Sequence, residues 1–165
     1  MAMPTAPIVI RPERPDHPAV RQLLAELDAY LATLYEPDAN HILDERALLA
    51  PEVSFVVAEQ DGRIVGCAAA RRQKAEAGTG LRPYGEIKRM MVAPSMRGQR
   101  VGARLLESLE SWLRRQGIPQ ALLETGELQV GAVRLYERCG YRRRAAFGGY
   151  PDNGLSLFFE KTLVA

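Results

Sequence analysis

Apolar residues recur along this chain with two periods, and each period predicts a different kind of element. Spacings of three and four residues predict a helix over about 18–34, another over 100–115 and a third over 130–139. A shorter helix is expected within 41–50. Runs of β-branched and other apolar residues predict strands, at about 8–12, 53–59, 63–72, 85–92, 120–125, 141–147 and 155–163.

Turn and capping residues between these elements set their boundaries. Asp61-Gly62, a dipeptide that tolerates positive φ, joins two β-rich runs and predicts a hairpin. Asp16 is placed to cap the first helix, which has Pro18 in its first turn, and Gly140 fits the position just after the last helix. The order is strand, two helices, three strands, helix, strand, helix and two strands. It predicts a mixed α/β domain with a strand–loop–helix unit at its centre.

The composition argues against several classes of partner. The 165 residues are expected to form one domain over 1–165, large enough to bury a core without disulfides or metals. Lysine and arginine number 22 against 20 acidic side chains, and the resulting net charge of +2 argues against nucleic acid as a partner. The basic run at 141–144 is therefore interpreted as a solvated strand edge.

Cysteine spacing and the N-terminal segment indicate a cytoplasmic protein that needs no metal. Cys67 and Cys139 have neither CxxC nor zinc-ligand spacing, and both are interpreted as small buried hydrophobes. The first 18 residues lack the basic and apolar regions of an export signal, and no apolar run approaches ~18 residues. We therefore expect neither export nor a membrane partner.

The stretch MMVAPSMRGQRVGARLL, residues 90–106, joins a predicted strand to a predicted helix through a loop rich in glycine and arginine. Every helix opens with four N–H groups that lack intrahelical partners, and the helix dipole adds positive charge there. The N–H groups of residues 98–102, with the side chains of Arg97 and Arg100, form a candidate pyrophosphate site. The glycine patterns of P-loops and Rossmann folds are missing. A surface loop of solvated arginines is the alternative interpretation.

Three segments together resemble the GCN5-related N-acetyltransferase (GNAT) superfamily. They are VAPSMRGQRVGARLL at 92–106, the preceding GEIKRMM at 85–91, and LLETGELQVGAVRLYERCGY at 122–141. The signature of the superfamily is [QR]-x-x-G-x-[GA] at the strand-to-helix junction, with LYE and a later glycine–aromatic pair near the C-terminus. The element order is similar over residues 8–163.

The resemblance implies a mixed, mostly antiparallel sheet of about six to seven strands flanked by about four helices. Its two central strands would splay apart around acetyl-CoA, whose pantetheine would pair with the strand before the loop as an added strand does. Gln129 stands where many relatives have a cofactor-binding asparagine. The residues implied in cofactor binding are Met90, Met91, Val92, Arg97, Gly98, Gln99, Arg100, Val101, Gly102, Ala103, Gln129 and Tyr136.

One position departs from the signature, because Arg100 stands where the superfamily has a glycine. A positive φ at an arginine costs roughly 1 kcal/mol, so we predict an ordinary helical φ at this residue. Binding through main-chain N–H groups would survive the change. The side chain of Arg100 is expected to contact a phosphate of the cofactor.

Acyl transfer to an amine needs a base, an oxyanion donor and an acid for the leaving thiolate. The base is needed because an alkyl ammonium with a pKa near ~10 is mostly protonated at neutral pH. Glu86 matches the place of the base in histone-type members, and Glu124 matches its place in ribosomal-protein N-terminal acetyltransferases; Glu86 is slightly preferred. Tyr136 is implied as the general acid, although its apolar helix face also fits a core tyrosine. The Val92 N–H is the expected oxyanion donor, which a strand bulge would allow.

Two loops, at 34–45 and 147–154, are expected to close over the acceptor, and their candidate side chains are Tyr35, Asn40, His41 and Tyr150.

The predicted function is transfer of an acetyl group from acetyl-CoA to a primary amine of a small metabolite or amino acid. The alternatives are a protein N-terminus or lysine as acceptor, a non-catalytic acyl-CoA-binding module and a nucleotide-phosphate binder. Homodimers are common in the superfamily, so a homodimer is a further expectation.

Overall fold

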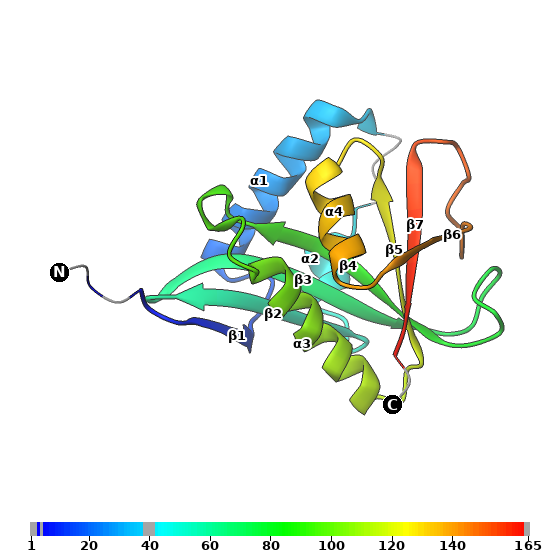
Figure 1. Cartoon of the computed structure of the whole chain (residues 1–165), viewed down its shortest axis with the longest axis horizontal. Coiled ribbons are helices and arrows are strands. Elements are labelled where there is room, and N and C mark those ends of the chain that lie inside the picture. The colour runs from blue at the N-terminus through cyan, green and yellow to red at the C-terminus, as the bar shows by residue number, and fades with distance from the viewer. Residues whose placement is uncertain (1–2, 4, 38–41, 164–165) are drawn as a thin grey trace.

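The computed structural model describes residue 3 and residues 5–37 and 42–163. Within these residues, seven strands form one mixed sheet with four α-helices on its two faces (Figure 1). The elements are β1 (Ile8–Pro12), α1 (Pro18–Leu34), α2 (Glu45–Leu48), β2 (Val53–Gln60), β3 (Arg63–Gln73), β4 (Tyr84–Val92), α3 (Val101–Arg115), β5 (Gln120–Gly126), α4 (Val130–Arg138), β6 (Arg142–Arg144) and β7 (Ser156–Thr162). The predicted fold class and element order are confirmed.

The sheet has the strand order β1-β2-β3-β4-β5-β7-β6, and only the central pair β4–β5 is parallel. Asp61 and Gly62 have φ values of 52° and 75°, so the predicted hairpin between β2 and β3 is confirmed. The parallel pairing is short, because it joins only Gly85 to Ala121 and Glu86 to Leu122. Beyond these pairs β4 and β5 diverge, as Figure 1 shows.

Alternating side chains bury the sheet between two helical layers. Val56 and Ala58 of β2 face a core cluster that includes Leu105 of α3, and α4 contributes to the same cluster. Phe55 and Val57 of the same strand face a second cluster, which contains the buried residues of α1 and α2. Because side chains alternate between the faces of a strand, each side chain of β4 and β5 points toward one of these two helical layers.

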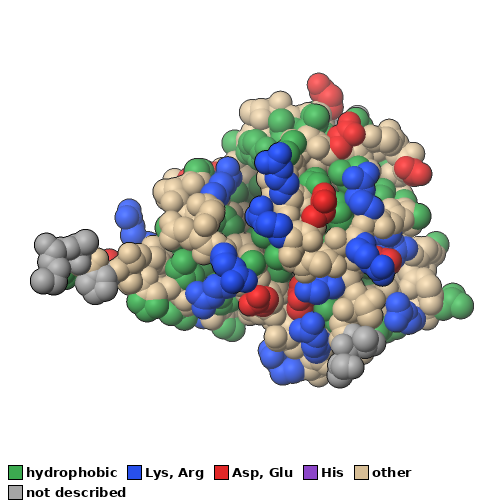
Figure 2. Space-filling model, in the orientation of Figure 1, with side chains coloured by type: hydrophobic (Ala, Val, Ile, Leu, Met, Phe, Trp, Pro, Cys, Tyr) green, Lys and Arg blue, Asp and Glu red, His purple; other side chains and the backbone are tan. Residues whose placement is uncertain are grey.

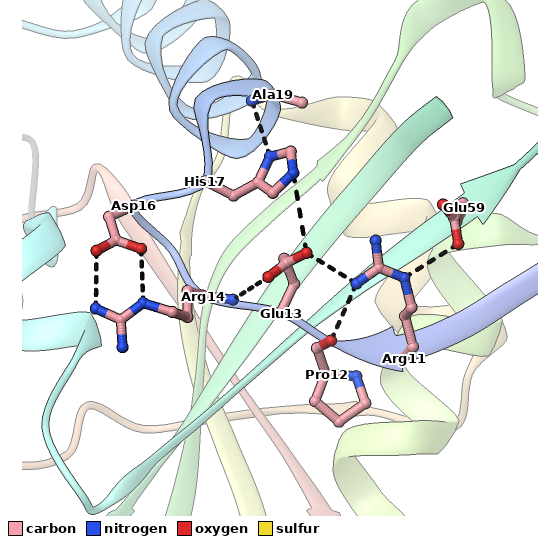
Figure 3. Close-up of polar contacts among 8 residues, drawn as sticks. All are labelled: Arg11, Pro12, Glu13, Arg14, Asp16, His17, Ala19 and Glu59. Carbon is pink, nitrogen blue, oxygen red and sulfur yellow. Dashed lines mark hydrogen bonds and ion pairs between the residues drawn. The ribbon is translucent and has the colours of Figure 1, made fainter. Parts of the chain in front are cut away.

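The N-terminus of α1 is capped by His17 and not by Asp16, so that prediction is wrong. The Nδ1 atom of His17 accepts a hydrogen bond from the Ala19 N–H at 3.1 Å (Figure 3). Asp16 is occupied elsewhere, since it accepts two hydrogen bonds from the Arg14 guanidinium, at 2.8 and 3.0 Å. The competing arginine two residues away therefore decides which side chain caps the helix.

The strand predicted at 141–147 is shorter than expected, because β6 ends at Arg144. After it, the chain leaves the sheet edge and buries Phe147 against Tyr84 and Phe158, with ring centroids 5.4 and 5.8 Å away. This aromatic cluster lies over β4, β5 and β7. It brings Tyr150 back onto the sheet, where its ring lies 5.4 Å from that of Phe147.

Candidate active site

A β-bulge interrupts β4 where the strand begins to leave β5. Cys67 of β3 pairs with Met91 and Ala69 pairs with Lys88, so β4 has one more residue than β3 between these pairs. Arg89 lies in this interval with a left-handed φ of 57°. The bulge shifts the alternation of side chains, and it confirms the expectation of an irregular strand just before the loop.

The bulge is followed by main-chain groups that face the opening between β4 and β5. Ala93 donates its N–H to the Val65 carbonyl at 2.8 Å, so the next pair, Gly66 with Val92, is of the non-hydrogen-bonded type. The N–H and C=O of Val92 therefore point away from β3 and toward the opening. Met91 belongs to the alternate pair, so its main chain bonds to β3 and its side chain packs under α1.

At the start of α3, directly after the loop that follows β4, several main-chain N–H groups have no hydrogen-bond partner within the helix. No side chain among the described residues caps this helix, and the first N–H to bond back is that of Arg104, to the Arg100 carbonyl at 3.1 Å. The N–H groups of Val101, Gly102 and Ala103 are thus open to an anion. Together with the positive end of the helix dipole, they form a site suited to a phosphate.

The backbone of Arg100 is left-handed, with a φ of 64°, so the prediction of an ordinary helical φ is wrong. Gly98, two residues earlier, has a φ of 82°. A left-handed residue followed directly by a helix gathers successive N–H groups on one side, the arrangement found in anion-binding concavities. The glycine of the superfamily signature was therefore a better guide to the backbone here than the arginine that replaces it.

The side chain of Arg100 extends into solvent, with 78% of its surface exposed, and its Nη2 atom lies 4.0 Å from Glu107. Figure 2 shows further lysine and arginine side chains spread over the face that carries α3 and α4. This face offers positive charge around the open N-terminus of α3. The arginines can approach an anionic ligand without giving up a buried partner.

Gly102 lies where α3 meets α4. A Cβ atom at this position would be 2.7 Å from Leu135 Cδ2 of α4, far inside a normal contact. The missing side chain therefore allows α4 to approach α3 closely. Tyr136 directly follows Leu135 in α4 and lies at the opening between β4 and β5.

A cavity lies at this opening and brings five of the predicted site residues together. Its lining includes Tyr35, Met90, Glu124, Gln129 and Tyr136, and it is called the wedge cavity below. The residues come from the end of α1, from β4, from β5 and from α4. Segments far apart in the sequence thus meet where the sheet splays.

Glu124 and Tyr136 are the two groups of the wedge cavity best suited to proton transfer. Glu124 Oε2 accepts a hydrogen bond of 2.7 Å from the Ser156 hydroxyl, which orients the carboxylate. Tyr136 is 6% exposed and packs with its ring 6.0 Å from that of Tyr141. Burial, and secondarily the charge of Glu124, raise the pKa of Tyr136 above 10, so its hydroxyl stays protonated at neutral pH.

Tyr35 fastens the end of α1 to the turn between β5 and α4. Its hydroxyl accepts a hydrogen bond from the Leu128 N–H at 2.9 Å, and the side chain of Gln129 lies close to it. A Cβ atom on Gly126 would collide with this hydroxyl, so glycine permits the contact. Tyr35 and Gln129 are therefore held together at one wall of the wedge cavity.

Glu86 lies in a separate place, beside a second cavity lined by Arg71, Glu76 and Tyr150, called the side cavity below. Glu86 is 1% exposed; its Oε1 lies 3.2 Å from Arg71 Nη2, and its Oε2 lies 3.8 Å from Lys88 Nζ. The hydroxyl of Tyr150 donates a hydrogen bond to the same carboxylate. Glu86 is thus the centre of a buried polar cluster.

Two basic residues of the wedge cavity, Lys88 and Arg89, were missed by reasoning from sequence. The signal was present, since two consecutive charges in GEIKRMMV break the apolar pattern of a central strand. Two other predicted residues, Asn40 and His41, lie outside the described residues.

Within the described part of the chain, no group of three or more His, Cys, Asp or Glu side chains could hold a metal ion. None of the helices described there has the length and apolar character needed to cross a membrane.

Known proteins with similar sequences and structures are acyltransferases. The chain is 44% identical over 156 residues to the IAA acetyltransferase of Azospirillum brasilense, covering 94% of this chain and 98% of that one. A crystal structure of a candidate acyl-CoA N-acyltransferase from Klebsiella pneumoniae is 34% identical, with a TM-score of 0.77 and coverage of 95% and 98%.

A third similarity concerns the fold alone. The PaiA N-acetyltransferase from Thermoplasma acidophilum, solved in complex with coenzyme A, superimposes with a TM-score of 0.72 at 17% identity, over 94% of this chain and 99% of that one. Residues 18–141 match the Acetyltransferase (GNAT) family, a range that runs from the start of α1 through α4. With the splayed sheet and the open N-terminus of α3, these similarities show that the chain belongs to the GNAT family and is an acetyltransferase.

Proposed function

We propose that this enzyme transfers the acetyl group of acetyl-CoA to a primary amine of a small metabolite or amino acid, by direct attack of the amine on the thioester. The observation that carries the proposal is the pairing of Glu124 and Tyr136 in the wedge cavity. They come from different layers of the fold, a carboxylate from β5 and a phenol from α4, and both line the gap where β4 and β5 part.

The residues present fit acetyl-CoA, which would supply the activated acyl thioester. The open N–H groups at the start of α3 suit a pyrophosphate, with Arg97 and Arg100 nearby for further charge. The main-chain groups of Val92 face the opening and offer strand-like pairing to an amide-containing chain such as pantetheine. Gln129 adds an amide at the wall of the same cavity.

Glu124 is assigned as the base in this proposal. The incoming amine is mostly an ammonium ion at neutral pH, so a carboxylate must take its proton directly or through water. Glu124 lines the wedge cavity, and Ser156 fixes one of its oxygens at 2.7 Å. Its negative charge also attracts a cationic acceptor.

Glu86, which the sequence favoured slightly, is assigned a positioning role. Its carboxylate is surrounded by Arg71, Lys88 and Tyr150 and lines the side cavity, away from Tyr136. Its two oxygens are already engaged by these side chains. It holds Lys88 and Tyr150 in place.

Tyr136 and Val92 complete the transfer. The amine nitrogen forms a bond to the acyl carbon as the carbon–sulfur bond breaks. One ammonium proton passes to Glu124 before the attack; as the amide forms, the nitrogen loses a second proton to water, and the phenolic proton of Tyr136 passes to the departing sulfur. The Val92 N–H, which points into the opening, would donate to the acyl oxygen as negative charge builds there. Both proton carriers then exchange with solvent.

Calorimetry tests the cofactor part of the proposal. CoA and acetyl-CoA are expected to bind, and ATP is expected not to compete with them. Competition by ATP would favour a nucleotide-phosphate binder, and failure to bind CoA would contradict the proposal outright.

Turnover assays test the acceptor part. Release of free thiol from acetyl-CoA is followed with small amines, amino acids and, because of the Azospirillum relative, IAA, beside a panel of peptides. Activity on small amines is expected. Activity on peptides alone would identify a protein acetyltransferase, and CoA binding with no turnover of any acceptor would identify a binding module.

A further inference from the structure

The wedge cavity and the side cavity lie end to end along one face of β4. Ile87 packs in the core cluster of α3, so its neighbours Glu86 and Lys88 point to the opposite face of the sheet. Glu86 lines the side cavity, and Lys88 lines the wedge cavity. Residues two apart in a strand are separated by about 7 Å. The two cavities therefore adjoin at this point of β4.

The side chain of Tyr150 lies over this boundary. Its hydroxyl accepts a hydrogen bond from Lys88 Nζ at 2.7 Å and donates one to the Glu86 carboxylate. Lys88 Nζ also lies 5.3 Å from the centre of the Tyr150 ring. Tyr150 thus contacts one residue of each cavity, and it forms a partition between them.

Packing and polar contacts together hold the partition in place. The ring of Tyr150 lies 5.4 Å from that of Phe147 and 5.9 Å from that of Phe158, and both phenylalanines are buried. Its hydroxyl bonds to two charged groups, and such hydrogen bonds are stronger than those between neutral groups. A ligand that displaced Tyr150 would deprive the buried Glu86 of a hydrogen bond, which is costly. We therefore expect the partition to stay closed when an acceptor enters the wedge cavity.

The loop before Tyr150 is built to bring its ring to this position. Gly148 has a φ of 59°, and a Cβ atom on it would lie 2.9 Å from Glu76 Oε2. Its N–H donates a hydrogen bond to the Ala77 carbonyl at 2.9 Å. These contacts fasten the loop to the connection between β3 and β4. The position of the partition is thus set by the backbone as well as by the ring.

The two cavities differ in size. The wedge cavity has a volume of about 90 Å³, and the side cavity has one of about 300 Å³. Small-molecule sites in proteins usually have volumes of ~300–1,000 Å³, so the wedge cavity by itself suits only a small acceptor. Removal of the partition would open the larger space beyond it.

We propose that Tyr150 sets the length of the acceptor, because its ring closes the wedge cavity off from the side cavity and admits only a short amine. The inference rests on the proposed function, since it concerns the acceptor of the same transfer. Tyr150 acts by occupying space, and it takes no part in the transfer of protons to Glu124 or from Tyr136. Without its ring, the side cavity would receive the far end of a longer amine.

A series of ω-amino alcohols, from 2-aminoethanol to 8-amino-1-octanol, provides acceptors that differ only in length. Their hydroxyl ends suit the side cavity, whose lining includes the polar side chains of Arg71 and Gln73. In the wild-type enzyme, kcat/KM with acetyl-CoA is expected to fall at least tenfold once the chain outgrows the wedge cavity. In Tyr150→Ala, the longest members should gain at least tenfold relative to the shortest, because burial of each further methylene group is worth about fourfold.

Tyr150→Phe is the matched control for Tyr150→Ala. It keeps the ring, and with it the partition, and it removes only the hydroxyl. Its dependence on chain length is expected to match that of the wild-type enzyme, whatever the change in absolute turnover. Tyr150→Leu is a second opening variant, which keeps some apolar contact with Phe147 and is expected to behave like Tyr150→Ala. Thermal unfolding of each variant separates a change of specificity from a loss of fold.

A crystal structure of Tyr150→Ala or Tyr150→Leu tests the partition without any acceptor. A continuous channel of ordered water from Glu124 to Arg71 is expected. Two cavities that remain separate would overturn the inference, and so would one dependence on chain length shared by the wild type and the opening variants.

The outcomes also separate the partition from the proposed catalysis. A continuous channel in the variant, with no turnover of any amine, would support the partition and contradict the catalysis. Turnover of short amines with the same preference for length in every variant would support the catalysis and contradict the partition. A shift toward long acceptors in Tyr150→Phe would contradict the role given to the ring.

Discussion

The two ends of the opening between β4 and β5 are built from different parts of the chain. On the side of α3 and α4, the groups aimed at the opening are main-chain N–H groups: those at the start of α3 and that of Val92. On the side of α1, the groups are side chains, among them Glu124, Lys88 and Arg89. A main-chain site depends on backbone shape and tolerates changes of side chain, whereas a side-chain site changes its chemistry with every substitution.

Arg100 illustrates this tolerance. An arginine replaces the glycine of the GNAT signature, and the backbone still adopts a left-handed conformation, with a φ of 64°. The N–H groups at the start of α3 are open to an anion as they would be with glycine. By the same reasoning, the identity of the acceptor should depend on the side chains over β4 and β5.

The two glutamates of the α1 side give the sharpest test of this difference, and the largest expected effect. Glu124→Gln is expected to lower kcat by about 10²-fold or more, because the amide cannot take the ammonium proton. Glu86→Gln is its matched control, since it leaves Arg71 and Lys88 without their carboxylate and is expected to lower the free energy of unfolding by about 3 kcal/mol. Steady-state kinetics and urea unfolding measure both. A greater loss of kcat in Glu86→Gln would reverse the assignment of the base.

Tyr136→Phe tests the proton donor between the two ends. Loss of the hydroxyl is expected to lower kcat by about 10²-fold and to leave the KM for acetyl-CoA nearly unchanged. Because the pKa of Tyr136 is raised, the wild-type kcat should not decline through loss of this proton until the pH exceeds 10.

Tyr141→Phe is the matched control for Tyr136→Phe. The ring of Tyr141 lies 6.0 Å from that of Tyr136, and its hydroxyl donates to the buried Glu110 at 2.9 Å. This variant is expected to lower stability by about 1–3 kcal/mol with little change in kcat. Equal losses of kcat in the two variants would make Tyr136 a packing residue.

Gly102→Ala tests the packing that supports the main-chain site. The new methyl group would lie 2.7 Å from Leu135 Cδ2, so the Leu135 side chain must rotate or α4 must move away from α3, at a cost of about 1–3 kcal/mol in unfolding free energy. Gly131→Ala, within α4 and with open space around its Cβ position, is expected to stabilise the protein by about 0.5–1 kcal/mol. Chemical denaturation of both variants measures the difference. Equal stability would show that α4 does not depend on the close approach at Gly102.

Arg100 gives the smallest expected effect. Arg100→Gly should raise the free energy of unfolding by about 1 kcal/mol because it removes the strain of a left-handed arginine, and Arg100→Ala should not. The affinity for CoA, measured by calorimetry, should fall equally in both variants, by no more than about 1 kcal/mol. A large loss in both would show that the side chain carries the binding and would remove the contrast between the two ends.

The order of elements could be predicted from the sequence because periodicity and turn residues are local signals. Asp61-Gly62 and the apolar spacing of α3 and α4 belong to this class. The cap of α1 depends on Arg14, which competes for Asp16, and the left-handed backbone of Arg100 contradicts the preference of an arginine while matching the glycine of the signature.

Glu124 and Tyr136 were found through the motifs, but the separation of Glu86 from them could not be. It depends on contacts made across the fold, by Arg71 from the neighbouring strand and by Tyr150 from a loop that the aromatic cluster pulls back onto the sheet. The bulge at Arg89 is likewise a matter of pairing with β3. Strand register and tertiary contacts are non-local, so no short window of sequence contains them.

The short parallel pairing between β4 and β5 also predicts an order of folding. Strands β2, β3 and β4 follow one another in sequence and pair as antiparallel neighbours, whereas β5 must find β4 across the length of α3 and β1 must find β2 across α1 and α2. Local pairings form faster than distant ones, so β2, β3 and β4 are expected to fold early, and β1, β5, β7 and β6 to dock afterwards. Amide protons at Gly85 and Glu86 would then gain protection last among those of β4. The acceptor site and the cofactor site, on the two sides of the opening between β4 and β5, would therefore form together in that final step.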